Sequence, residues 1–491
     1  MITHKEKPGK VQLLLIILAA MLMVIAWWGV IQLENNSIIR KFERKGQPFS
    51  YIGPIEAQNV PGVIVAHGFG GSQQLMLGFG NTFARSGYGV MLMDFKGHGA
   101  NSNPMDSTRS GLQEDIEAAT QLLIAQPEIN PDYIALLGHS MGSGAVMQAG
   151  IENPDQYDAV IAISPTGAEV SESVPPNLLL MAGEWESRFI ANAQQLLEEA
   201  GGPSANFKGK LARKFVEIPN VEHISILFNM KSQKQAVEWL NQTFEIEGDS
   251  VVRDRRILLY GLHIGAWLIL SYATKPLIRS HDKQPNDRSP LWRSWIGLVL
   301  APFIATALLV LLNTLVDITN ILNMLVGGAL GVWFLLMGVI WLVGSVRLNT
   351  PKRKNIIQGF LIFAILWLAL GLMAQFTWMN WFLIPSRLWR WPIFVFTCLP
   401  WKLAAGTAYQ HSTNKGKLGI WALQNLVLVS ALVVIAFLVP GMFIVILIAP
   451  VLPIIIAVES LVGVQYDAPW AYGIGSALFF GWMMAAFFPI V

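Results

Sequence analysis

The sequence predicts a doubly wound α/β domain with a mainly parallel sheet, fused to an all-α domain with several membrane spans. In residues 34–256, short apolar runs alternate with helix-like stretches, and 26 acidic residues stand against 17 basic ones. Long apolar runs fill residues 257–491, where 14 basic residues stand against 5 acidic ones. Together with an N-terminal segment, residues 1–33, these blocks predict three domains.

The overall composition excludes several classes of protein. Of the 491 residues, 53% are hydrophobic and 13% are charged, whereas soluble domains average about 25% charged residues. A plain cytosolic enzyme and a disordered chain do not fit. The single Cys398 cannot form an internal disulfide. We expect no nucleic-acid partner, because the acidic block has no basic cluster with interleaved aromatic residues.

The N-terminal segment contains one apolar run. Residues 11–33 are an uncharged stretch of 23 residues that follows three lysines, and about 20 apolar residues span a bilayer. The run continues through Trp27 and Trp28 without a convincing cleavage site. We therefore interpret it as a retained signal anchor that crosses the membrane, rather than a cleaved signal peptide.

Further apolar runs after residue 256 predict about eight more membrane spans. They lie near residues 257–278, 295–313, 324–346, 356–376, 391–410, 418–438, 441–462 and 468–490. Pro440, Pro450 and Pro453 interrupt the pattern, so the number of spans after residue 438 stays open.

The distribution of basic residues predicts the orientation of the spans. With a cytoplasmic N-terminus, the acidic block lies outside, and the loops that then face inward are basic, as the positive-inside rule requires. Their basic residues are Arg279, Lys283, Arg288, Arg293, Arg347, Lys352, Arg353, Lys354, Lys415 and Lys417. Arg387 and Arg390 are exceptions, and they lie in a Trp-rich tract, residues 376–391. We interpret this tract as an interfacial segment on the outer surface of a multi-pass cell-membrane protein.

Six short apolar runs predict the strands of the sheet, because continuous apolar runs suit strands that are buried on both faces. They are Gly62–Ala66, Val90–Met93, Ile134–Leu137, Val160–Ile163, Leu178–Met181 and Phe215–Ile218. Helix-like stretches such as 111–126 and 189–200 lie between them. In such sheets, ligands bind beyond the carboxyl ends of the strands.

The clearest chemical motif is Gly138-His139-Ser140-Met141-Gly142, directly after a predicted strand. The pattern G-x-S-x-G between a strand and a helix is typical of a nucleophile elbow, in which glycines allow a tight turn that exposes the serine hydroxyl. The sequence therefore predicts Ser140 as a nucleophile.

A serine nucleophile needs a base, and the base needs an orienting acid. His223 follows the predicted strand that ends at Ile218, and it is the only histidine between Ser140 and the membrane block. Glu184 and Glu186 both follow the strand that ends at Met181. We favour Glu186 as the acid and keep Glu184 as the alternative.

Acyl chemistry also needs two backbone N–H donors for the oxyanion. Met141, the residue after the nucleophile, is predicted to supply one. The glycine-rich turn His67–Gly71 follows a predicted strand, and we assign the second donor to Phe69 in this turn.

These motifs resemble the α/β-hydrolase superfamily, and they are most similar to its serine aminopeptidase and monoacylglycerol-lipase-like branch. The resemblance covers roughly residues 50–245. It rests on His67–Gly71, Asp94–Gly99, Gly138–Gly142, Gly183–Glu186 and His223. It implies Ser140 as nucleophile, His223 as base, Glu186 as acid, and Phe69 and Met141 as oxyanion donors, with no cofactor or metal. It also places Asp94, His98 and His139 at fold-supporting positions.

The sequence departs from this family in two places. Glu186 stands where the family usually has Asp. Only 14 residues separate Ile163 from Leu178, where relatives with lipase activity insert a cap domain. We therefore expect a fold without a cap domain, in which the globular block alone leaves its site open. Residues 376–391, or the bilayer surface itself, are expected to cover this opening.

The membrane block resembles no family that we can name. A transporter needs ionisable residues at bilayer depth, and only Glu459 and Lys402 qualify; snorkelling or an interfacial position would explain Lys402. An anchoring, scaffolding or substrate-presenting role is favoured over transport.

Three classes of function remain. We favour a membrane-bound serine hydrolase that cleaves esters of acylated or lipid-like molecules. A peptidase or an acyltransferase with the same triad is the alternative, and a non-enzymatic sensor with a relic fold is the third class. Apart from the bilayer and a small-molecule or lipid ester, the sequence identifies no partner.

Overall fold

The computed structural model describes residues 9–35, 37–106, 109–247, 254–278, 291–345, 348, 350–466 and 468–491. The expected basic residues Arg279, Lys283, Arg288 and Arg347 lie outside these ranges. The chain forms two compact units. The sheet unit comprises Trp27–Tyr260, Ala374–Phe382 and Pro489–Val491, and the helical unit comprises Met1–Ala26, Gly261–Met373 and Leu383–Phe488. Each unit is described by itself.

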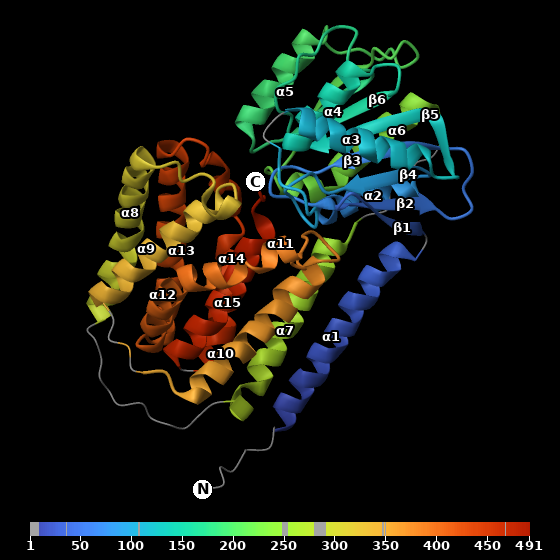
Figure 1. The fold of residues 1–491 in the computed structure, drawn as a ribbon. Helices are drawn as coiled ribbons and strands as arrows, with labels where there is room; N and C mark the ends of the chain where they lie inside the picture. Colours follow the sequence, from blue (N-terminus) through green and yellow to red (C-terminus); the bar gives the residue numbers. More distant parts are fainter. Residues whose placement is uncertain are drawn as a thin grey trace. The chain divides into compact units, whose positions relative to one another are not determined.

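The sheet unit is built on one eight-stranded sheet with the order β1-β2-β4-β3-β5-β6-β7-β8 (Figure 1). In the part of the sheet that runs β4-β3-β5-β6-β7-β8, every pair of neighbouring strands is parallel. The predicted mainly parallel sheet is therefore confirmed. The strands are β1 (Ser37–Arg44), β2 (Gln47–Pro54), β3 (Val60–Ala66), β4 (Gly89–Met93), β5 (Ile129–His139), β6 (Ala159–Ile163), β7 (Leu178–Gly183) and β8 (Arg213–Ile218). Two further strands at one edge, β1 and β2, were not predicted; β2 pairs antiparallel with both β1 and β4.

Helices cover both faces of the sheet, as the strand–helix alternation predicts. Successive strand residues point to opposite faces: Val63 and Val65 belong to one buried apolar cluster, and Ile64 belongs to the other. The first cluster includes α2 (Leu77–Arg85) and α6 (Met230–Phe244). The second includes α3 (Arg109–Ile124), α4 (Met141–Glu152) and α5 (Ser187–Glu199).

The connection between β6 and β7 contains no helix and no strand in residues 164–177, all of which are described. The absence of a cap domain here agrees with the short spacing in the sequence. The carboxyl ends of β5, β7 and β8 therefore lead directly into the turns that carry the candidate site residues.

Seven helices of the described chain are long and apolar enough to cross a membrane. They are Lys10–Glu34, Arg256–Lys275, Trp292–Leu315, Gly327–Gly344, Arg353–Leu372, Asn414–Leu438 and Pro469–Phe487. They correspond to the expected signal anchor and to six of the eight expected later spans.

The other two expected spans have a different form. α12 (Trp391–Gln410) is 20 residues long but less apolar, since it carries Lys402. The run 441–462 is divided into a 3₁₀ turn, Phe443–Ile448, and the 12-residue α14 (Leu452–Gly463). Proline removes a backbone donor and favours helix starts, which explains the break at Pro450 and Pro453.

Lys402 and Glu459 form an ion pair inside the helical unit. Lys402 Nζ lies 2.5 Å from Glu459 Oε2, and neither side chain is exposed. The ammonium also lies 3.7 Å from the centre of the Trp401 ring, which adds a cation–π attraction. The interpretation of Lys402 as a snorkelling or interfacial residue is therefore wrong, because its charge is neutralised by Glu459 on a neighbouring helix.

Lys402→Met should destabilise the helical unit by about 3–5 kcal/mol, because it leaves the Glu459 carboxylate buried without its partner. The double variant Lys402→Met/Glu459→Leu should recover most of this loss. The measurement is thermal unfolding of the full chain in detergent, with the exposed Lys354→Gln as the control. A single variant as stable as this control would contradict the prediction.

Candidate active site

Ser140 lies on a sharp turn between β5 and α4. Its backbone angles, φ 52° and ψ −118°, are rare for a residue with a side chain and mark a strained position. A side chain at Gly138 would collide with the Gly142 carbonyl oxygen, and one at Gly142 would collide with the His67 carbonyl oxygen. The glycines of the motif are thus needed for the close packing of this turn.

The structure brings Ser140, His223 and Glu186 together from three different strand ends. His223 Nε2 lies 3.0 Å from Ser140 Oγ, and His223 Nδ1 lies 2.6 Å from Glu186 Oε1. Both His223 and Glu186 are buried. With Nδ1 donating to the carboxylate, Nε2 is left to accept the serine hydroxyl proton, which is the arrangement of a nucleophile with a general base.

Glu186 is held by two further donors. Its Oε2 atom accepts from Gly183 N at 2.7 Å and from Ser164 Oγ at 2.9 Å. Glu184, the alternative acid, is exposed and accepts from the backbone N–H of Asn220 at 2.7 Å. The structure therefore places Glu186, rather than Glu184, against His223.

Two residues that the sequence analysis did not identify complete this part of the site. Ser164 directly follows β6, at the same sheet edge as the other site residues, and this position is the only signal that could have found it. Phe189 on α5 stacks on the His223 ring, with ring centres 4.7 Å apart. Together they fix the carboxylate and the face of the imidazole.

His139 supports the loop that carries the base. Its Nε2 atom donates to the backbone carbonyl of His223 at 2.9 Å. Burial lowers the pKa of His139 well below its ordinary value, so His139 stays neutral at pH 7. Its role here is structural, as at the fold-supporting position that the resemblance implies.

The proposed oxyanion donors lie in two segments next to the nucleophile. Met141 is the first residue of α4, where backbone N–H groups have no partner within the helix. The turn His67–Gly71 passes beside the nucleophile, since a Cβ atom on Gly68 would lie 3.1 Å from Ser140 Cβ. Phe69 is the next residue of this turn.

The turn is fixed by the loop that follows β4. His67 Nδ1 donates to Gly68 O at 2.7 Å, and His67 Nε2 accepts from the N–H of Phe95 at 3.1 Å. Burial lowers the pKa of His67, which favours this neutral form. Asp94 accepts from Gln73 N at 2.7 Å and from Ala100 N at 2.8 Å, and burial raises the pKa of this carboxyl.

Two segments distant in sequence also belong to the sheet unit and contact these loops. In the segment 374–382, Asn380 N donates to Ser72 Oγ at 3.1 Å, one residue beyond the turn. Ile490 N donates to Gly97 O at 2.9 Å, and Ile490 O accepts from Met105 N at 2.7 Å. The expectation that residues 376–391 lie over the site agrees with the position of Asn380, but neither hydrogen bond was predicted, since no local pattern links residues more than 300 positions apart.

We expect Ser72→Ala to lower kcat by up to about fivefold, the effect of one buried hydrogen bond. The substitution removes the acceptor for Asn380 N–H and loosens the end of the turn that carries Phe69. Because the effect is on the oxyanion and not on substrate binding, KM should change less than kcat. Steady-state kinetics of the full chain measure this, with the exposed Ser173→Ala as control; an equal kcat in both variants would contradict it.

Within the described ranges, no group of three or more His, Cys, Asp or Glu side chains could hold a metal ion.

Comparison with known proteins identifies relatives of the sheet unit. Residues 58–222 match the sequence model of a family described as "Serine aminopeptidase, S33". An uncharacterised protein of Mycobacterium tuberculosis is 29% identical over 94 residues, which are 19% of this chain and 33% of that protein. The matched stretch thus spans a third of that relative's length.

Solved structures resemble less than half of the chain. A dienelactone hydrolase from Anabaena variabilis is 18% identical, with a TM-score of 0.32, over 42% of this chain and 97% of its own. A soluble variant of monoglyceride lipase from Saccharomyces cerevisiae is 14% identical, with a TM-score of 0.32, over 43% of this chain and 96% of its own. A membrane phospholipase A is 14% identical, with a TM-score of 0.33, over 47% and 93%.

Proposed function

We propose that the sheet unit, which is an α/β hydrolase, cleaves carboxylic esters through an acyl-enzyme on Ser140. The observation that carries this proposal is the chain of contacts from Ser140 Oγ through both nitrogens of His223 to Glu186. A strained elbow that holds a serine hydroxyl against such a series of contacts is the arrangement that makes the hydroxyl a nucleophile.

The geometry supports a two-step mechanism. His223 Nε2 takes the hydroxyl proton as Ser140 Oγ attacks the ester carbonyl, and the backbone N–H groups of Phe69 and Met141 stabilise the oxyanion. His223 then gives its proton to the leaving alkoxide as the ester C–O bond breaks. A water molecule, deprotonated by His223, then attacks the acyl carbonyl. His223 returns the proton to Ser140 Oγ as the bond from the acyl carbon to Oγ breaks, and the acid is released. Glu186 stabilises the imidazolium throughout.

The side chains around the triad favour an ester with an apolar acyl group. Phe189 stacks on the imidazole, and Met141 directly follows the nucleophile. Such apolar surface at a site suits an acyl chain. The description of the matching family favours the second candidate, an aminopeptidase with the same triad.

Two measurements test this function with the purified full-length protein. A fluorophosphonate probe should label Ser140, and p-nitrophenyl esters should be hydrolysed faster than aminoacyl anilides. Faster turnover of the anilides would favour the peptidase, and the absence of both labelling and turnover would favour a relic fold.

The membrane helices lead to a proposal for the origin of the substrate. The sheet unit includes the ends of two apolar helices as well as the segment 374–382, where Phe376 packs on Trp27 with ring centres 5.6 Å apart. We place this unit on the outer face of the cell membrane, where a long-chain substrate reaches the uncapped site from the bilayer. The remaining tract, residues 383–391, belongs to the helical unit.

The full-length protein in lipid nanodiscs should therefore prefer long-chain over short-chain esters more strongly than isolated residues 34–250. The ratio of the two rates is the readout, because loss of the contacts from Asn380 and Ile490 lowers both rates together. An unchanged ratio would show that the membrane part has no role in substrate selection.

A further inference from the structure

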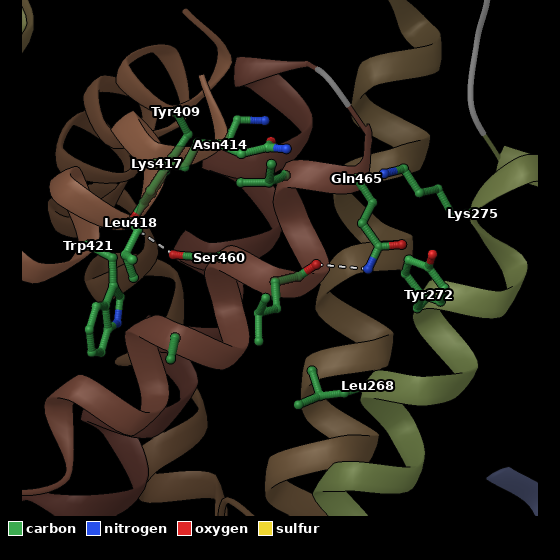
Figure 2. A pocket seen from close by; sticks show the side chains of 13 residues that line it. Leu268, Tyr272, Lys275, Tyr409, Asn414, Lys417, Leu418, Trp421, Ser460 and Gln465 are labelled. Carbon is green, nitrogen blue, oxygen red and sulfur yellow. Dashed lines mark hydrogen bonds between the residues drawn. The ribbon is translucent and has the colours of Figure 1, made fainter. Parts of the chain in front are cut away.

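The helical unit contains an open groove with a volume of about 770 Å³ (Figure 2). Side chains from α7 (Arg256–Ile278), α12, α13 (Asn414–Leu438) and α14 form its wall. The volume lies within the range of about 300–1,000 Å³ that is usual for ligand pockets. All lining residues belong to the helical unit, so the groove is not part of the candidate active site.

The wall of the groove changes from polar to apolar along the helices. Lys275 lies in the last turn of α7, and Asn414 and Lys417 lie in the first turn of α13. Leu268 lies seven residues before Lys275 in α7, about 10 Å deeper along the helix axis. Figure 2 shows Lys275, Asn414 and Lys417 toward one end of the groove and Leu268 toward the other.

The polar end is positively charged. Two lysines, Lys275 and Lys417, contribute to the wall, and none of the described residues that line it is acidic. Because the helices end here, this part of the groove lies where a membrane-spanning bundle meets the headgroup region. Basic grooves between spanning helices at this depth suit anionic lipid headgroups.

Hydrogen bonds fix the shape of the groove. Ser460 Oγ donates to Tyr409 Oη at 3.0 Å and joins α14 to α12. Gln465, in the 3₁₀ turn Val464–Tyr466 that follows α14, donates through Nε2 to Leu461 O at 2.8 Å and to Ser271 Oγ at 3.0 Å, which joins this turn to α7. The groove is thus preformed, and a ligand does not have to order its walls.

We propose that this groove binds one anionic phospholipid, with its phosphate between Lys275 and Lys417 and an acyl chain along Leu268 and Ala457. The apolar inner wall argues against a free phosphate ion, which would gain nothing from it. The paired lysines argue against a zwitterionic lipid, whose own cation would face them. In the orientation predicted by the basic loops, the groove opens to the cytoplasmic leaflet, which carries anionic lipids. The proposal does not depend on the reaction at Ser140.

The test is native mass spectrometry of the full-length protein in detergent, titrated with phosphatidylglycerol, phosphatidylcholine or glycerol phosphate. We expect one phosphatidylglycerol per chain, bound at least tenfold more tightly than the other two probes. Lys275→Gln/Lys417→Gln should weaken its binding roughly 30-fold, about fivefold for each lysine near an anionic lipid.

Lys415→Gln is the matched control, because Lys415 is exposed in the same helix turn as Lys417 but does not line the groove. It should bind phosphatidylglycerol as the natural chain does. Ala457→Trp tests the groove without a change of charge: the indole fills the inner wall, so binding should fall at least tenfold.

Three results would each overturn the proposal. They are equal affinity for phosphatidylcholine, equal affinity for glycerol phosphate, and phosphatidylglycerol binding that survives both the double lysine variant and Ala457→Trp. The last result would place the lipid at another surface of the chain.

Discussion

Ser140→Ala should abolish fluorophosphonate labelling and reduce ester turnover by about 10⁴–10⁶-fold. The substitution removes the proposed nucleophile, the oxygen that lies 3.0 Å from His223 Nε2. The fold should be unaffected, because the Cβ atom and the φ of 52° are kept. Thermal unfolding of the variant verifies this, so that a loss of turnover reports chemistry.

His223→Ala should have an effect of similar size, since the nucleophile and its base act as one unit and their losses are not additive. The double variant should therefore be no slower than either single one. Turnover within tenfold of the natural chain in either single variant would exclude the acyl-enzyme on Ser140. Ser173→Ala, at an exposed position, is the control for the purification and storage of the variants.

The parallel strands and the turns after them could be predicted because their signals are local. A continuous apolar run such as Ile134–Leu137 reports burial on both faces, and the glycines around Ser140 report the backbone that the elbow needs. The edge strands β1 and β2 were not predicted because they are only partly apolar: β1 has four charged residues beside three apolar ones, without the regular alternation that marks a half-buried strand.

Contacts between distant segments could not be predicted in the same way. Ser164 and Phe189 are ordinary residues in the sequence, and they gain a role only because the sheet places β6 beside β7. Asn380 and Ile490 contact the loops of the sheet unit across hundreds of residues. The Lys402–Glu459 pair was missed for the same reason: each charge was judged alone, and only packing shows that they neutralise each other.

Replacement of the acid should be almost as damaging as loss of the base, although it changes a single atom. Glu186→Gln should reduce kcat by about 10⁴-fold, as the equivalent carboxylate-to-amide change does in other triads. Glu184→Gln should change kcat less than twofold, since an amide oxygen can still accept from Asn220 N. Steady-state kinetics on a short-chain ester measure both, and the reverse order would move the acid to Glu184.

The reason lies in the donors around the carboxylate. Oε2 of Glu186 accepts from Gly183 N and Ser164 Oγ, and Oε1 faces His223 Nδ1. A glutamine that keeps its oxygen toward the first two donors must turn its NH₂ group toward Nδ1. This forces the imidazole into the tautomer in which Nε2 carries the proton and cannot accept one from Ser140. The opposite flip sets NH₂ against Gly183 N–H.

Ser164→Ala/Glu186→Gln tests this account of the amide orientation. A hydroxyl can accept as well as donate, so Ser164 Oγ can bond the amide in either orientation, and Gly183 N–H alone selects the unproductive one. Removal of the Ser164 hydroxyl leaves that selection in place, so the double variant should be no faster than Glu186→Gln alone, within about threefold. A double variant that is more than about tenfold faster would show that Ser164, rather than Gly183 N–H, fixes the orientation of this side chain.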